Sequence, residues 1–178
     1  MNTIDISGDR EGKVLLKKDI LYRELDSWID INASISEVWN MLINFESWEK
    51  WNSFIPMVQG ELKVGKKMSI KVVSPGMKEM FFKPKIYEIE QNKRISWGGS
   101  FLVFIYNGVH DFLLEYIDDK VTRFRQIEKF KGPIILLMQK MITKTAIGYQ
   151  NMNEELKQHI ENKVAKCVSQ KKDKVVYN

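Results

Sequence analysis

The order of the periodic segments along the chain constrains the fold more than any other feature. A helical and aromatic segment, 33–56, is followed by strand patterns as far as Gly132, and one long amphipathic stretch comes after them. Helical segments therefore bound a run of strands and do not alternate with them. This order predicts an α+β domain built on one curved antiparallel sheet.

Residues 33–56 have the pattern of a capped helix that runs into an aromatic segment. Ser34 and Glu37 have the S-x-x-E spacing of a capping box. Apolar residues on one helical face and a second aromatic cluster follow in the order Val38, Trp39, Leu42, Ile43, Trp48, Trp51 and Phe54. Because Pro56 cannot continue a helix, we expect two short helices here, directly after the first strand.

The strand patterns predict a sheet of about seven strands. Leu21–Ile31 is the first, and the others are expected near 56–63, 67–73, 79–90, 93–101, 104–117 and 120–130. The connections are short, and short connections join antiparallel neighbours. The apolar phase of 79–90 changes between Ile86 and Ile89, which predicts a β-bulge near Tyr87 and a local curl of the sheet.

The expected domain covers 21–162 and is flanked by two other segments. Residues 1–20 lack periodicity, and Gly8 and Gly12 interrupt any regular element, so this segment is interpreted as an N-terminal extension. Residues 163–178 are rich in lysine and are interpreted as a basic, mobile tail.

Composition favours a cytoplasmic protein. Much of the net charge of +5 lies after Glu161, in a tail without interleaved aromatic residues, so we expect no nucleic-acid partner. The lone Cys167 excludes an internal disulfide. Residues 1–20 are too polar for a signal peptide and the apolar run 133–138 is too short to cross a bilayer, so we expect no stable membrane insertion. The oligomeric state stays open, with a homodimer among the alternatives.

One long helix is predicted from Pro133, which suits a first helical turn. Its apolar stripe consists of Ile134, Met138, Met141, Thr145, Tyr149, Met152, Leu156 and Ile160. We expect Met138, Met141 and Leu156 to be plain core. Gly148 costs roughly 1 kcal/mol in a helix interior, and two explanations stay open: a close backbone approach, or space left for a ligand.

Several segments, taken in order, resemble the START-like, Bet v 1-like (SRPBCC) superfamily in its polyketide cyclase/dehydrase and lipid-transport branch. Over residues 22–162 they are ASISEVWNMLINFESWEKWNSFIP, VGKKMSI, FKPKIYEIEQNKRISW, HDFLLEYIDDKVTRFRQIEKFKG and NMNEELKQHI. The resemblance implies a helix-grip fold, in which the sheet wraps around a long C-terminal helix and encloses a cavity for an apolar ligand. It implies no single reaction, because the fold serves enzymes, carriers and receptors.

The hairpin 109–130 carries the best polar constellation. The alternation turns His110, Phe112, Leu114 and Tyr116 inward on one strand, and Phe124, Gln126, Glu128 and Phe130 inward on the other. A three-residue turn would pair Ile117 with Val121. The same register sets Leu114 opposite Phe124, Phe112 opposite Gln126 and His110 opposite Glu128.

Three readings of His110, Gln126 and Glu128 stay open. The imidazole and the carboxylate satisfy each other as part of the structure, or the three groups contact a ligand's polar head, or they perform acid–base chemistry on it. Other enzyme signals are weak: no metal-ligand spacing is present and Cys167 has no neighbouring base, so we expect neither a metal nor a cofactor. Trp97 is read either as a cavity wall or as ordinary core.

The sequence thus predicts binding or transport of a small hydrophobic or amphipathic ligand, such as a lipid, an isoprenoid or a polyketide-like molecule. The expected lining is Trp97, His110, Phe112, Gln126, Glu128, Thr145, Tyr149 and Met152, with Met77, Phe81 and Phe82 at the mouth. The alternative is an aromatase/cyclase-type enzyme with His110 and Glu128 as candidate catalytic residues. A third reading is a protein-interaction module that exposes Trp48–Phe54.

Overall fold

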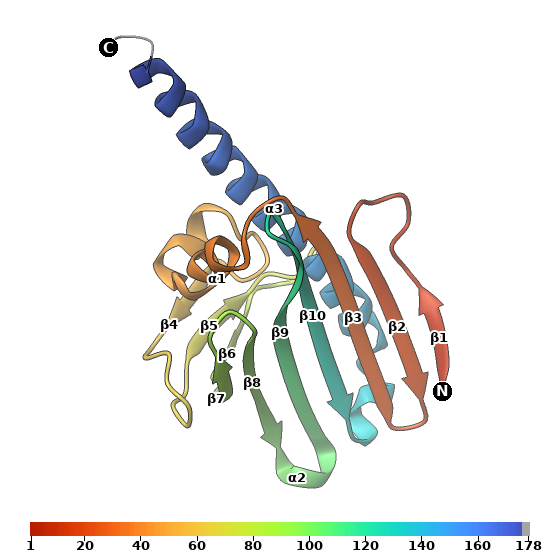
Figure 1. Ribbon diagram of the computed structural model, residues 1–178. Coiled ribbons are helices and arrows are strands. Elements are labelled where there is room, and N and C mark those ends of the chain that lie inside the picture. The colour runs from red at the N-terminus through yellow and green to blue at the C-terminus, as the bar shows by residue number, and fades with distance from the viewer. Residues whose placement is uncertain (176–178) are drawn as a thin grey trace.

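The main element of the fold is a seven-stranded antiparallel sheet with the strand order β1-β2-β3-β10-β9-β8-β7 (Figure 1). The computed structural model describes residues 1–175, and their side chains except at 101, 103, 104 and 165–175. The strands are β1 Asn2–Asp5, β2 Lys13–Asp19, β3 Tyr22–Ile31, β7 Lys85–Glu90, β8 Arg94–Phe101, β9 Tyr106–Asp118 and β10 Val121–Lys131. The expected antiparallel sheet is therefore confirmed.

A second, three-stranded sheet consists of β4 Met57–Gln59, β5 Ser69–Val72 and β6 Met80–Phe82. The strand expected at 79–90 is thus divided between two sheets. Pro84 lies at the division and has no N–H to donate to a ladder, although its carbonyl accepts the backbone N–H of Met68 at 2.8 Å. The bulge is confirmed, because the pairing of β7 with β8 shifts register between Ile86 and Glu88.

Residues 1–20 contain two strands, which corrects the expectation that they form no regular element. β2 pairs with β3 along its whole length, and β1 pairs with β2. Val14 and Leu16 of β2 are buried in the core. Gly8 and Gly12 lie between the two strands, so they interrupt the chain without preventing either strand. Pairing with β3 supplies the stability that the weak local pattern did not reveal.

The helices are α1 Ile35–Ile43, η1 Phe45–Lys50, α2 Leu102–Ile105, η2 Pro133–Leu136 and α3 Gln139–Val175. The capping box is confirmed: the Glu37 carboxylate accepts the backbone N–H of Ser34 at 2.9 Å. The single helix expected from Pro133 is divided into a 3-10 turn, η2, and the long α3. No helix in the described part of the chain is long and apolar enough to span a membrane.

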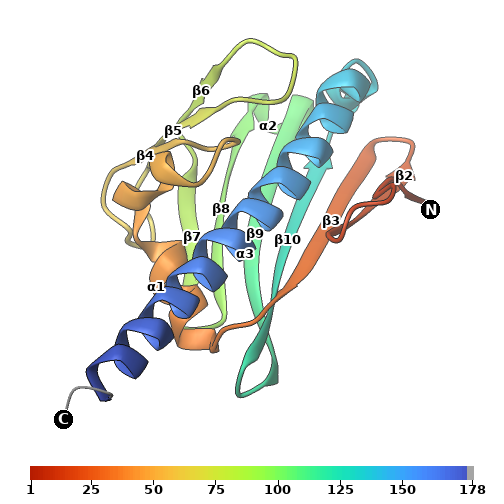
Figure 2. The ribbon, with the colours of Figure 1, turned by 90° about the horizontal axis from the view of Figure 1, so that it is seen from above.

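α3 crosses the concave face of the sheet, as the helix-grip fold requires (Figure 2). Its backbone continues past residue 162 to Val175, and the last turns extend beyond the rest of the fold (Figure 1). The end of the expected tail, residues 176–178, lies outside the described residues. The mobility of the tail stays a prediction.

The core fills one half of the space between the sheet and α3. Trp48 of η1 is fully buried, packs edge-on to Phe112 with ring centroids 6.0 Å apart, and donates its indole N–H to the Leu42 carbonyl at 3.0 Å. Trp51 and Phe54 are buried as well. The reading of Trp48–Phe54 as an exposed interaction module is therefore wrong, since this cluster closes one end of the core.

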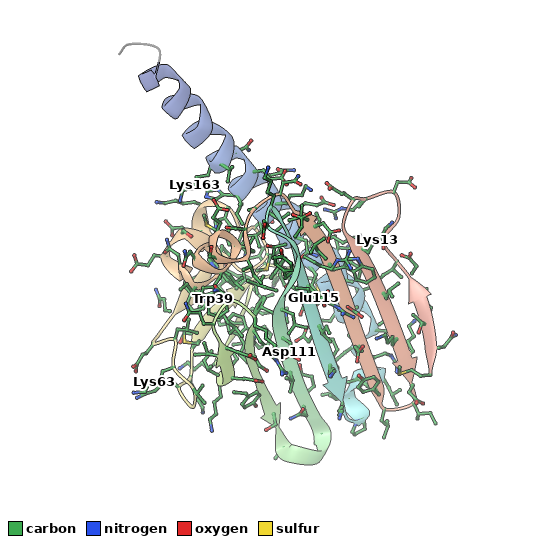
Figure 3. The ribbon with its side chains drawn as sticks, in the orientation of Figure 1. Lys13, Trp39, Lys63, Asp111, Glu115 and Lys163 are labelled. Carbon is green, nitrogen blue, oxygen red and sulfur yellow. The ribbon has the colours of Figure 1, made fainter. Side chains whose placement is uncertain are left out.

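Charged residues lie on the opposite, convex face of the sheet. Asp111 and Glu115 point away from α3 (Figure 3). Asp111 is 2.9 Å from Arg94, and Glu115 is 3.0 Å from Arg125, which also bonds Asp26 at 2.8 Å. These ion pairs confirm which side chains of the hairpin face outward.

The register of the hairpin β9–β10 is confirmed where it matters for the interior. Phe112 lies opposite Gln126, and His110 lies opposite Glu128. The turn is different: Val121 pairs with Asp118 and not with Ile117, and the register shifts directly after it. The shift leaves Ile117 unpaired in a bulge, which restores the alignment of the two apolar faces.

Candidate functional site

A cavity of about 500 Å³ lies between the sheet, α3 and the smaller sheet. Its walls are mostly apolar and come from elements far apart in the sequence. Representative wall residues are Phe54, Ile70, Val72, Phe130, Ile134 and Met141. This volume is within the usual range for a site that holds a small organic molecule.

Five of the predicted lining residues line this cavity: Trp97, His110, Glu128, Thr145 and Tyr149. They come from β8, β9, β10 and α3, and the pairing of the three strands brings the first three together. Trp97 is both a cavity wall and a buried residue, so its two readings are compatible.

Phe112, Gln126 and Met152 do not line the cavity, which corrects the prediction. All three are buried in the packed half of the core. Gln126 donates its amide N–H to Asn153 Oδ1 at 2.6 Å, and Asn153 donates in turn to Ser27 Oγ at 2.8 Å. Phe112 and Gln126 share a strand face with the lining residues, but Trp48 of η1 packs against Phe112 and Asn153 of α3 bonds to Gln126.

The apolar stripe predicted after Pro133 divides in the same way. Leu156 is fully buried core, as expected, but Met138 and Met141 are half-buried and line the cavity, so the expectation of plain core is wrong for them. At the mouth, Phe82 lines the cavity, whereas Phe81 and Met77 do not.

Gly148 makes room for an aromatic ring. A Cβ built on Gly148 would clash with the ring of Phe54, at 2.2 Å from its Cδ2 atom. That ring packs edge-on to Tyr149, with centroids 5.5 Å apart. The explanation for this glycine is therefore the close approach of a side chain, Phe54, and not of a backbone segment. The cavity borders Phe54 and does not reach Gly148.

Glu128 and Tyr149 form a hydrogen-bonded pair on the cavity wall, in which the tyrosine hydroxyl donates to Glu128 Oε2. Burial raises the pKa of the Glu128 carboxyl to about 7, against the lowering effect of the Tyr149 hydrogen bond. Burial and the neighbouring carboxylate both raise the pKa of Tyr149, so its hydroxyl stays protonated. The alternation of β10 predicted the position of Glu128, but no pattern in the sequence pairs it with residue 149.

His110 does not contact Glu128 through a hydrogen bond or an ion pair among the described residues. Its ring lies between those of Phe112 and Tyr149, with centroids 4.1 Å and 4.8 Å away. Burial lowers the pKa of His110 to about 3, so the imidazole is neutral near pH 7. The reading of a self-satisfied imidazole–carboxylate pair is therefore wrong.

Two further polar features belong to the site. The His110 Nε2 atom is buried without a hydrogen-bond partner in the described part of the protein. Tyr106, which the sequence analysis missed, lines the cavity, and burial and Glu128 raise the pKa of its hydroxyl. Its position at the start of β9 continues the inward alternation through Gly108 to His110, a signal that could have revealed it.

Chemically, the site can bind a polar group and can exchange a proton at Glu128. A carboxyl with a pKa of about 7 is populated in both protonation states near neutrality. Tyr149 supplies a hydrogen-bond donor next to it. Among the described residues, no three His, Cys, Asp or Glu side chains are grouped so that they could hold a metal ion.

A family model described as "Polyketide cyclase / dehydrase and lipid transport" matches residues 23–161. Sequence comparison with the curated proteins finds no match.

Solved structures share the fold at low sequence identity. Protein Ms6760 from Mycobacterium smegmatis is 15% identical with a TM-score of 0.64, over 83% of this chain and 97% of that one. Norcoclaurine synthase from Thalictrum flavum, solved with dopamine and hydroxybenzaldehyde, is 11% identical with a TM-score of 0.61, over 80% of this chain and 88% of that one. The protein Ara h 8.0201 is 12% identical with a TM-score of 0.59, over 79% of this chain and 99% of that one.

Proposed function

Because the chain belongs to the polyketide cyclase/dehydrase and lipid transport family, we propose that it binds a small amphipathic molecule in the cavity. The apolar part of the ligand lies against the aromatic and aliphatic walls. Its polar group lies against Glu128, Tyr149 and His110 on the wall that β9, β10 and α3 share.

The observation that carries this proposal is the combination of an apolar cavity of about 500 Å³ with a small polar cluster on one wall. Most ligand sites have this composition, in which apolar walls supply affinity and few polar groups fix orientation. If this region were only packed core, burial of the polar Glu128 and His110 side chains would cost folding free energy with no compensating interaction for His110.

The polar cluster favours a ligand with an uncharged hydroxyl or carbonyl group. Above pH 7 the Glu128 carboxylate would repel an anionic group, whereas it accepts a hydrogen bond from a hydroxyl. An isoprenoid alcohol or a phenolic, polyketide-like compound has the required combination of groups. The structural similarity to norcoclaurine synthase, solved with dopamine and hydroxybenzaldehyde, supports the idea that this fold accommodates small phenols.

A fluorescence titration tests the proposal with a matched pair of variants. Thr145 lines the cavity, and Thr143 lies two positions away on α3 and is exposed. We expect a neutral probe, N-phenyl-1-naphthylamine, to bind the wild type and Thr143→Phe, to be displaced by farnesol, and to bind Thr145→Phe at least about tenfold more weakly because the new ring occupies the cavity. Equal binding by all three proteins would contradict the proposal.

Native mass spectrometry of protein purified from its own host would identify the natural ligand. A small molecule that accompanies the wild type and Thr143→Phe but not Thr145→Phe is the expected result. A molecule that stays with Thr145→Phe would have to lie outside the cavity.

A second candidate function is enzymatic, and the pKa of Glu128 is the observation that favours it. A carboxyl that exchanges protons near pH 7, next to a bound polyketide-like substrate, suits the proton transfers of an aromatase/cyclase-type reaction. His110 suits this role less, because its pKa of about 3 keeps the imidazole unprotonated near neutral pH. The test is turnover of such a substrate by Glu128→Gln and by His110→Ala. Turnover that survives Glu128→Gln would exclude proton transfer by this carboxyl.

A further inference from the structure

Exposed apolar side chains gather at one end of the protein. We call this set the tip surface: Ile20, Leu21, Leu102, Leu136 and Leu137, all of them exposed large aliphatic residues. Leu137 is 87% exposed and Leu102 is 67% exposed. Isolated exposed leucines are ordinary on a protein surface, so the question is whether these residues form one surface.

Three neighbouring segments carry the tip surface: the β2–β3 turn, α2 and η2. Figure 1 shows them together at the end of the sheet where β9 begins and β10 ends. The backbone N–H of Gly132 donates to the Leu21 carbonyl at 3.1 Å, which joins the β2–β3 turn to the start of η2. α2 and η2 also contact each other. The five side chains therefore belong to one end of the protein.

Two of these segments are apolar in sequence: α2 reads Leu-Val-Phe-Ile, and 133–138 reads Pro-Ile-Ile-Leu-Leu-Met. Among their described side chains, Leu102, Leu136 and Leu137 are exposed, whereas Ile135 is buried and Ile134 and Met138 line the cavity. Ordinary turns use polar residues together with Gly, Asn and Asp. Contiguous exposed apolar patches on a soluble domain indicate a surface that contacts a membrane or another protein.

Basic residues flank the apolar ones. The segment 131–140 contains Lys131 and Lys140 and no acidic residue, and both lysines are exposed. In the β2–β3 turn region, Lys18 and Arg23 lie on either side of Asp19, whereas Lys17 is paired with Glu24 and Asp26. An apolar surface with a basic border is complementary to the apolar interior and the anionic headgroups of a bilayer.

The cavity reaches the same end of the protein. Ser100 and Tyr106, on either side of α2, line it, and so do Ile134 of η2 and Met138. A bilayer in contact with the tip surface would therefore lie next to this part of the cavity wall.

We propose that the tip surface docks reversibly on an anionic lipid bilayer. This inference goes beyond the proposed function, and it stands even if the cavity holds no ligand. A second copy of the chain fits less well, because two tip surfaces face to face would bring Lys131 and Lys140 near their own counterparts. The docking is peripheral, through side chains at the ends of turns.

Vesicle co-sedimentation tests the apolar contribution. The probes are vesicles of phosphatidylcholine alone and vesicles of equal parts phosphatidylcholine and phosphatidylglycerol. Leu137→Asp removes an exposed apolar group from the tip surface. Ile117→Asp is the matched control, because Ile117 is 46% exposed at the β9–β10 turn, at the other end of these strands. We expect Leu137→Asp to lower the partition coefficient on the mixed vesicles by at least about tenfold, with Ile117→Asp close to the wild type.

A second pair of variants tests the contribution of charge to vesicle binding. Lys140→Glu at the tip surface should weaken binding to the mixed vesicles several-fold, whereas Lys120→Glu at the opposite turn should change it little. Binding should also fall as salt is raised and should be weaker on phosphatidylcholine alone.

Two results of the vesicle experiment would overturn the docking proposal. One is failure of the wild type to bind the mixed vesicles, and the other is an equal loss of vesicle binding in Leu137→Asp and Ile117→Asp. Sedimentation equilibrium adds another: a wild-type dimer that Leu137→Asp converts to a monomer would assign the surface to a second copy. N-phenyl-1-naphthylamine binding, which Leu137→Asp should leave intact, separates failure of docking from failure of the cavity.

Discussion

Glu128→Gln should change the pH dependence of stability in a defined direction. Burial raises the pKa of Glu128 from its ordinary 4.5 to about 7 in the folded protein. Between these values the folded state holds a proton that the unfolded state has released. The free energy of unfolding therefore falls as pH rises through this window, and this effect is complete above pH 7.

The size of the effect follows from the two pKa values. One pKa unit corresponds to about 1.4 kcal/mol, so the ionised carboxyl costs about 3 kcal/mol of stability at pH 8 compared with pH 4.5. This is an upper figure, because the Glu128 side chain is only partly buried and water that reaches it would solvate the carboxylate. Glutamine is uncharged at every pH and can still accept the Tyr149 hydrogen bond. Glu128→Gln should thus be up to about 3 kcal/mol more stable than the wild type at pH 8 and about equal to it near pH 4.5.

Urea unfolding followed by tryptophan fluorescence, from pH 5 to pH 8, measures this difference. His110 has a lowered folded pKa of about 3, so it stabilises the protein above its ordinary 6.5 and that contribution is lost as pH falls. Both proteins contain His110, and its effect cancels in the difference. Glu49→Gln, at an exposed glutamate, controls for the loss of one negative charge. A wild-type to Glu128→Gln difference that is constant across this pH range, or that shrinks as pH rises, would refute the reasoning.

Three other substitutions test the packing and the hydrogen bonds of the site. Tyr149→Phe removes the donor that lowers the pKa of Glu128, so that pKa should rise further; a fall, measured by carboxyl NMR titration, would contradict the assignment. The same variant should lose about 1.5–3 kcal/mol of stability at pH 8, where the lost bond is to a charged group, and less at pH 5. Gly148→Ala should destabilise by about 1–3 kcal/mol in spite of its better helix propensity, because the new methyl group would overlap Phe54; a raised melting temperature would show that the ring moves aside freely. Asn153→Ala should cost about 1–3 kcal/mol in urea unfolding, since it leaves two buried side-chain partners unsatisfied, and a loss below about 0.5 kcal/mol would indicate that water replaces the amide.

Much of the fold could be predicted from local patterns. The change of apolar phase at Ile86 gave the bulge, and the S-x-x-E spacing gave the capped helix. The alternation of the hairpin gave the pairing of His110 with Glu128 even though the turn itself was predicted wrongly. Register depends on which face is apolar, and a bulge absorbs an error of one residue at the turn.

The candidate site was predicted only in part. Alternation correctly placed Phe112 and Gln126 on the inner face, but it could not show that η1 and α3 fill the space in front of them. It could not show that Phe54 would occupy the space beside Gly148, 94 positions away in the chain. The strand β2 was missed because its pattern is short and its stability comes from pairing with β3.

The amino-acid sequence by itself determined most of the helices and strands of the central part of the chain and which of their side chains share a face, because both properties depend on periodicity over a few neighbouring residues. Only the tertiary structure decided which half of the inner face is packed and which half borders the cavity, and that Tyr149 rather than His110 bonds to Glu128. The physical reason is that these outcomes depend on the positions of elements far away in the sequence, and the residues next to a side chain in the sequence do not specify those positions.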